Sequence, residues 1–153
     1  MRRRIVLTTT SVLAGCALVA ASAASAAPAK KTKTKVKSGS YTVTAPPDPT
    51  MEGTGEAGME CFNIDPASAD NHPLALPGTG LLKIVLDSPD PTKNHMDWDL
   101  HLLDSKGNII ASSNGGTAHE EIDMPGMKGK VTIRSCNLAG EPTATVKWTF
   151  LYH

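Results

Sequence analysis

The chain has 153 residues with 15 basic and 15 acidic side chains, so its formal net charge is zero. This charge is unevenly divided, because from Ser38 onward seven basic residues stand against all fifteen acidic ones. A region this acidic repels phosphate backbones, which excludes nucleic acid as an expected partner. No stretch after residue 27 approaches about 20 consecutive apolar residues, so we expect no transmembrane segment in the mature chain.

The first 26 residues have the pattern of an export signal. Arginines at positions 2–4 form a positive start, residues 5–21 form a mostly apolar run, and Ala24-Ser25-Ala26 supplies a small-residue cleavage site. The sequence therefore predicts a signal peptide over residues 1–26 and a secreted, extracellular protein.

A second interpretation of the same segment centres on Cys16. The stretch LAGC at residues 13–16 resembles the cleavage site of bacterial lipoproteins, which would leave the protein lipid-anchored at the cell surface through Cys16. The apolar run continues past the cysteine through residues 17–21, which favours free secretion. Both interpretations stay open.

Residues 27–39 (APAKKTKTKVKSG) combine lysines with Pro, Thr and Ser and contain almost no apolar side chain. Such a segment cannot bury enough surface to offset the entropy lost on ordering, so we expect a flexible tether. It is either a solvated linker or a contact with an anionic wall polymer or membrane surface. A single domain is expected to follow over residues 40–153.

From residue 40 the apolar residues recur with a period of two, which is typical of strands with one buried face. We expect an all-β, jelly-roll-like antiparallel β-sandwich of about eight short strands. Residues 65–79 are expected to form an irregular crossover between sheets. The predicted strands are 41–44, 59–64, 80–87, 97–103, 108–113, 119–124, 130–136 and 145–152.

Alternation also predicts which side chains of these strands are buried. Trp98 in DWDLHLL and Trp148 in the last strand are expected to point into the core. Asp97, Asp99 and His101 then fall on the solvent face. Asp97 and Asp99 need no catalytic role to explain them.

The next aspartate along the chain, Asp104, begins the turn Asp-Ser-Lys-Gly. Its carboxylate is expected to accept hydrogen bonds from backbone N–H groups of the turn. Gly107 is expected to take the left-handed conformation that closes the hairpin.

Two cysteines remain after the predicted cleavage, Cys61 and Cys136. An even pair in an exported chain predicts a disulfide, because the extracytoplasmic space is oxidising. A disulfide that closes the loop from residue 61 to residue 136 would stabilise the fold by about 4 kcal/mol in the chain-entropy model.

Three stretches together resemble a known family. They are DWDLHLLDSKGNIIASSNGG at 97–116, EEIDMPGMKGKVTIRSC at 120–136 and TATVKWTF at 143–150. They are similar to the bacterial pre-peptidase C-terminal domain, whose core pattern is D-x-D-L-x-L-x-D-x-x-G-x-x-x-A-x-S. The resemblance covers residues 80–152. The residues in register with the family pattern are Asp97, Asp99, Leu100, Leu102, Asp104, Gly107, Ala111, Ser113, Glu121, Gly129 and Arg134.

The resemblance implies a compact, non-catalytic sandwich of the kind usually attached to secreted peptidases. Some relatives bind calcium, so Asp97, Asp99 and Asp104 are candidate ligands of a weak calcium site, with solvated carboxylates as the alternative. The family pattern does not include the Cys61–Cys136 pair, and this chain carries no peptidase.

The sequence lacks G-x-S-x-G, H-E-x-x-H and C-x-x-C motifs, so we expect no catalytic residues and no cofactor apart from that calcium. The expected function is a monomeric binding or accessory module for an extracellular protein or a cell-wall polymer. The alternative is a small secreted protease inhibitor, and a hydrolase comes third.

Overall fold

The computed structural model describes residues 32–49, 61, 64–89, 96–117 and 119–153. These residues belong to the unit Thr32–His153. The predicted export signal, Cys16 and residues 27–31 of the predicted tether lie outside the described residues.

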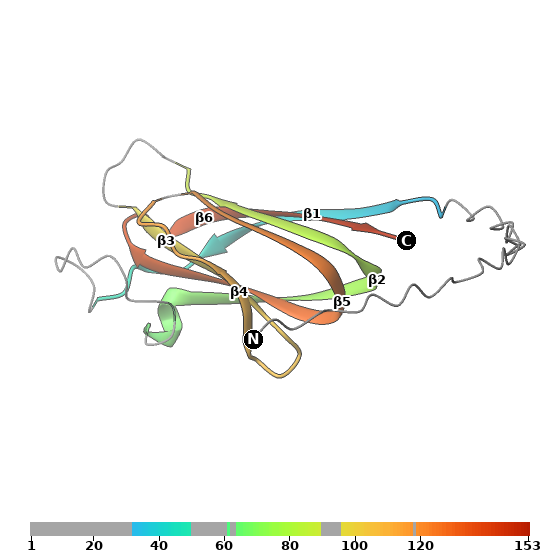
Figure 1. Cartoon of the computed structure of the whole chain (residues 1–153). Coiled ribbons are helices and arrows are strands. Elements are labelled where there is room, and N and C mark those ends of the chain that lie inside the picture. The colour runs from blue at the N-terminus through green and yellow to red at the C-terminus, as the bar shows by residue number, and fades with distance from the viewer. Residues whose placement is uncertain (1–31, 50–60, 62–63, 90–95, 118) are drawn as a thin grey trace, which may run out of the picture. The chain divides into compact units, whose positions relative to one another are not determined.

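Six antiparallel strands make up one sheet in the order β1-β6-β2-β5-β3-β4 (Figure 1). The prediction of an all-β antiparallel fold is confirmed, whereas the expected count of about eight strands is wrong. The strands are β1 (Lys35–Thr44), β2 (Ala69–Asp87), β3 (Asp97–Leu103), β4 (Ile109–Ser113), β5 (His119–Ala139) and β6 (Thr143–Tyr152), and a 3-10 turn, η1 (Pro66–Ser68), precedes β2.

The two longest strands, β2 and β5, each belong to both halves of the sheet. The second half of β2 pairs with β6 and with the first half of β5, while the first half of β2 pairs with the second half of β5. Register shifts in the β2–β5 pairing lie between Leu76 and Leu82, where the two strands bend together (Figure 1). The two layers are therefore one continuous sheet folded across β2 and β5.

One side of this folded sheet forms the interior. Even-numbered residues of β2 from Leu74 to Leu86 are buried on both sides of the bend, apart from the half-exposed Gly78 and Gly80. The predicted burial of both tryptophans is confirmed, since Trp98 is 0% and Trp148 is 8% exposed. The main core contains Val43, Ala45, Leu74, Leu76, Leu82, Ile84, Leu86, Trp98, Leu100, Leu102, Ile122, Met127, Val131, Ile133, Ala144, Val146, Trp148 and Phe150.

Two segments that contain Pro and Gly explain the wrong strand count. The predicted strands 119–124 and 130–136 are one strand, β5, which passes through a bend that contains Gly126 and Gly129, both with positive φ. The predicted crossover at 65–79 is instead η1 followed by the first half of β2. Pro73 is tolerated there because this half of β2 pairs on one side alone, with β5. Most of the predicted strand 59–64 lies outside the described residues.

The first strand begins earlier than the sequence predicted. β1 starts at Lys35 and pairs with β6 from Lys35 onward, so residues 35–39 belong to the sheet and not to the tether. The Lys37 ammonium donates a hydrogen bond of 3.3 Å to the carbonyl of Ala75. Tyr41 stacks on His72 with 3.9 Å between ring centroids. These two contacts link β1 to the first half of β2 in the other layer.

Among the described residues there is no helix long and apolar enough to cross a membrane.

Gly80 lies at the bend, where β2 and β6 approach closely. A Cβ atom at this position would overlap the backbone carbonyl of Leu151, which is not a side chain that can rotate away. We therefore expect Gly80→Ala to lower the free energy of unfolding by about 1–3 kcal/mol, the usual effect of overpacking. Urea denaturation followed by tryptophan fluorescence measures this change.

The control for this experiment is Gly116→Ala. A Cβ atom at Gly116 would meet nothing within 4 Å, so the free energy of unfolding of this variant should stay within about 0.5 kcal/mol of that of the parent protein. Equal midpoints for the two variants would show that the bend tolerates a side chain.

Candidate functional site

The structure confirms the predicted turn at Asp104. Its Oδ1 accepts hydrogen bonds from the backbone N–H groups of Lys106 (2.8 Å) and Asn108 (2.9 Å), and its Oδ2 accepts one from the Asn108 side chain (2.9 Å). The bonds from Asn108 lower the pKa of Asp104. Gly107 has φ +84°, the left-handed conformation that closes the turn.

Asp99 and His101 point away from the main core, as alternation predicted, but they are not on a solvent face. Asp99 is 2% exposed and His101 is 1% exposed, so the predicted solvation of both is wrong. Cys136 pairs with Asp99 across the strands and therefore faces the same side. It packs in a second hydrophobic cluster with Cys61 and Ile64, which covers this side of the sheet.

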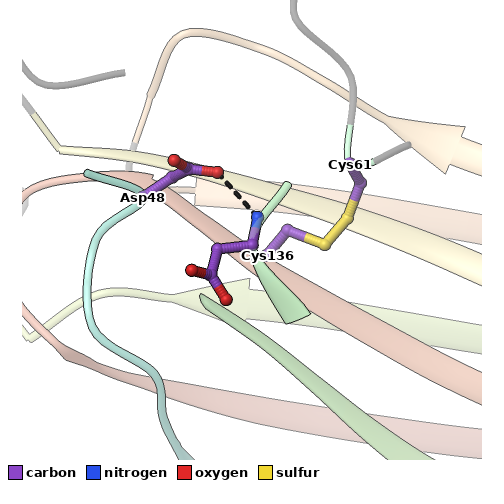
Figure 2. Close-up of a disulfide and its surroundings, with 4 residues drawn as sticks. Asp48, Cys61 and Cys136 are labelled. Carbon is purple, nitrogen blue, oxygen red and sulfur yellow. Dashed lines mark hydrogen bonds between the residues drawn. A yellow bond between two sulfur atoms is a disulfide. The ribbon is translucent and has the colours of Figure 1, made fainter. Parts of the chain in front are cut away.

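The predicted disulfide joins Cys61 to Cys136 with 5.8 Å between Cα atoms (Figure 2). Asp48 lies beside it and is 1% exposed. The Asp48 carboxylate accepts a 2.8 Å hydrogen bond from the backbone of Asp65, and its own N–H donates to the carbonyl of Asn137 at 3.0 Å. We call this outward side of β3 and of the second half of β5 the closed face.

Two other carboxylates come together at the start of β3 and β5. Glu120 is 2% exposed, and its two carboxylate oxygens accept hydrogen bonds from the Ser113 hydroxyl and from the Gly115 N–H at 3.0 Å. The same loop contacts β3, where the Trp98 N–H donates to the Thr117 carbonyl at 3.3 Å. Partial burial and then the charge of Glu120 raise the pKa of Asp97.

The structure does not assemble the three predicted calcium ligands into one site. Asp97 and Asp104 lie at opposite ends of β3, which separates their backbones by roughly 20 Å at about 3.3 Å per residue. Asp104 is occupied by its own turn, and Asp99 is buried on the closed face. Among the described residues no group of three or more His, Cys, Asp or Glu side chains could hold a metal ion.

Glu120 was not among the three candidate calcium ligands selected from the sequence. Its burial could have been predicted, because it lies two residues before the buried Ile122 and so shares its face. Asp48 carried no such signal, since it follows β1 in a proline-rich stretch and forms hydrogen bonds with Asp65 and Asn137, which lie far along the chain.

The opposite layer has an outward side that no other segment of the described chain covers. We call it the open face, and cross-strand pairing arranges its side chains in rows over four strands. Its residues are Val36, Ser38, Ser40 and Thr42 of β1, Thr145, Lys147, Thr149 and Leu151 of β6, Leu81, Lys83, Val85 and Asp87 of β2, and His119, Glu121 and Asp123 of β5.

Ion pairs join neighbouring strands of the open face. Lys83 contacts Asp123 at 2.5 Å, His119 contacts Asp87 at 2.7 Å, and Lys147 lies 3.8 Å from Asp87. Their side chains are 41–64% exposed, so each pair contributes little to stability and remains accessible to a partner. The hydrogen bond that the His119 ring donates to the Asp87 carboxylate raises the pKa of His119.

Comparison with models of known protein families and with characterised proteins found no match to this chain. The resemblance to the pre-peptidase C-terminal domain therefore stays a prediction from its motif.

Substitution of Asp97 tests the carboxylate pair. Because its pKa is raised on folding, the folded state holds this proton more tightly than the unfolded chain. Ionised Asp97 therefore opposes folding, and its effect grows as pH rises from about 3.8 through the raised pKa. We expect Asp97→Asn to melt at a higher temperature than the parent at pH 7 and at a similar temperature at pH 3.

The matched control is Glu121→Gln, which removes an exposed carboxylate from the residue next to Glu120. It should not reproduce the pH-dependent gain. A melting temperature of Asp97→Asn at or below that of the parent at pH 7 would show that ionised Asp97 does not oppose folding.

The His119–Asp87 pair should affect stability in the opposite way, because the charged form of His119 favours folding. A raised histidine pKa means that the pair stabilises the fold below about pH 6.5 and loses this effect as pH rises through the folded pKa. In an NMR titration, Asp87→Asn should lower the pKa of His119 toward about 6.5. Asp123→Asn, which removes a carboxylate that pairs with Lys83, should leave it raised. An unchanged His119 pKa in Asp87→Asn would show that the pair does not form in solution.

Proposed function

We propose that this protein is a non-catalytic extracellular binding module whose open face contacts an extracellular protein or a cell-wall polymer. The export signal predicted at residues 1–26 and the disulfide support a location outside the cell, where a Cys61–Cys136 bond persists. In the lipid-anchored alternative, Cys16 would hold the same module at the cell surface.

The observation that carries the proposal is that the outward sides of the two layers differ. The closed face is covered by its own chain, including the disulfide cluster around Cys61 and Ile64. The open face extends over β1, β6, β2 and β5 and presents hydroxyl and charged side chains on a rigid sheet. Side chains held on strands of a closed scaffold are positioned for a partner without further ordering, which favours binding.

The chemistry of the open face suits a polar partner. Ser40, Thr42 and Thr149 can donate and accept hydrogen bonds, and the ion pairs of Lys83 and Asp87 offer charges of both signs. A polysaccharide or a hydrophilic protein surface can bind to such groups through direct or water-mediated hydrogen bonds.

The test is retention of the purified protein by insoluble cell wall and by proteins of the producer's own culture fluid. We compare the parent with Thr149→Arg, which places a long side chain in the middle of the open face. The control is Ser112→Arg, the same change at an exposed position of β4 outside the open face.

Retention by the wall, or by one culture protein, that is lost in Thr149→Arg and kept in Ser112→Arg would support the proposal. A stoichiometric complex with a protease would instead identify the inhibitor alternative. Equal retention of all three proteins would exclude the open face as the binding surface.

A further inference from the structure

A groove of about 490 Å³ lies between the turn that joins β3 to β4 and the bend of β5. Its volume is within the range of about 300–1,000 Å³ that is usual for pockets that bind small molecules. The residues that matter for its chemistry are Asp104, Ile110, Met127, Lys128, Lys130 and Val131.

A free backbone edge lines this groove. β5 pairs with β3 only from Thr132 onward, where Thr132 lies opposite Leu103. Before that point, residues 129–131 pair with β2 on one side and with no described strand on the other. Such an edge has N–H and C=O groups that an added strand can use, which is the basis of β-augmentation.

The interior side of the groove is apolar. Met127 and Val131 are 8% and 4% exposed, so they form a floor that belongs to the main core. Ile110 on β4 is 37% exposed and is one of two large hydrophobic side chains classed as exposed in the described chain. An apolar side chain placed here would remove Ile110 from water at about 25 cal/mol per Å² of apolar area buried.

The solvent side of the groove is basic. Lys128 and Lys130 are both exposed, and neither forms an ion pair within the described residues. The nearby carboxylate of Asp104 already accepts three hydrogen bonds from its own turn. The two lysines are thus available to an anionic partner.

We propose that this groove binds an extended segment of a partner protein in which acidic and apolar residues alternate. The segment would add to the free edge of β5 beside Gly129–Val131. Strand alternation would then direct its apolar side chains toward Ile110 and Met127 and its acidic side chains toward Lys128 and Lys130. An anionic polysaccharide could meet the lysines but has no regular N–H and C=O groups to pair with the edge. This site lies apart from the open face and does not depend on it.

The experiment uses the protein as its host processes it and an acetylated, amidated peptide of alternating glutamate and valine. In ¹⁵N-edited NMR spectra, we expect saturable shifts of the backbone amides of residues 126–131 and of Ile110. Three other probes separate the sources of binding: an alternating lysine–valine peptide, the glutamate–valine peptide with alternate backbone nitrogens methylated, and polygalacturonate.

Two variants test the charge. Lys128→Glu/Lys130→Glu should weaken binding of the glutamate–valine peptide by about tenfold or more, since two favourable charge contacts become repulsive. Lys83→Glu/Lys147→Glu makes the same charge change on the open face and should leave binding unchanged. Because all four lysines lie at the surface, the dispersion of the NMR spectra verifies that both variants are folded.

The proposal is supported if the glutamate–valine peptide binds and if both backbone methylation of the peptide and the Lys128→Glu/Lys130→Glu variant reduce this binding. Equal binding by polygalacturonate, or by the methylated peptide, would reduce the site to simple attraction of anions and overturn it. Shifts confined to other residues, or none at millimolar peptide, would also overturn it. None of these results alters the retention test of the open face, so the two proposals can fail separately.

Discussion

The structure depends on the bend that β2 and β5 make together. Because these two strands cross from one layer to the other, the layers share a backbone, and one side of the sheet becomes the interior of both. The glycines at the bend allow this: Gly80 leaves room for the β6 backbone, and Gly126 and Gly129 adopt positive φ. The groove at β5 follows from the same geometry, since β3 ends before the bend and leaves one edge of that part of β5 without a partner among the described strands.

Much of the fold could be predicted from alternation, because a period of two is set locally by the pleat. Trp98, Trp148 and the Asp104 turn all lie where the sequence placed them. Strand continuity could not be predicted, because Pro and Gly occur both in turns and in bends of long strands, and Pro125-Gly126 reads as a turn although β5 continues through it.

The candidate sites show a second limit of prediction from the sequence, which comes from tertiary contacts. Alternation assigned Asp99 and His101 to the outward side correctly, but exposure depends on what covers that side, and here residues around the disulfide do. Glu120 shows the converse, since the face on which it lies could be predicted and its partners, Ser113 and Gly115, are only seven and five residues away in the chain. The outward side of one layer is thus covered by its own chain, whereas the outward side of the other layer is open among the described residues.

The pairing of β1 with β6 has a mechanical consequence. Lys35, the first residue of β1, lies opposite Tyr152, the last residue of β6, so the start of β1 and the end of β6 lie at the same corner of the sheet (Figure 1). A force that pulls these ends apart would act on the β1–β6 residue pairs one at a time, from Lys35–Tyr152 toward Thr44–Thr143. β1 would therefore detach from β6 at low force. The half of the sheet that contains Cys136 is tied by a covalent bond and would stay folded while β1 detaches.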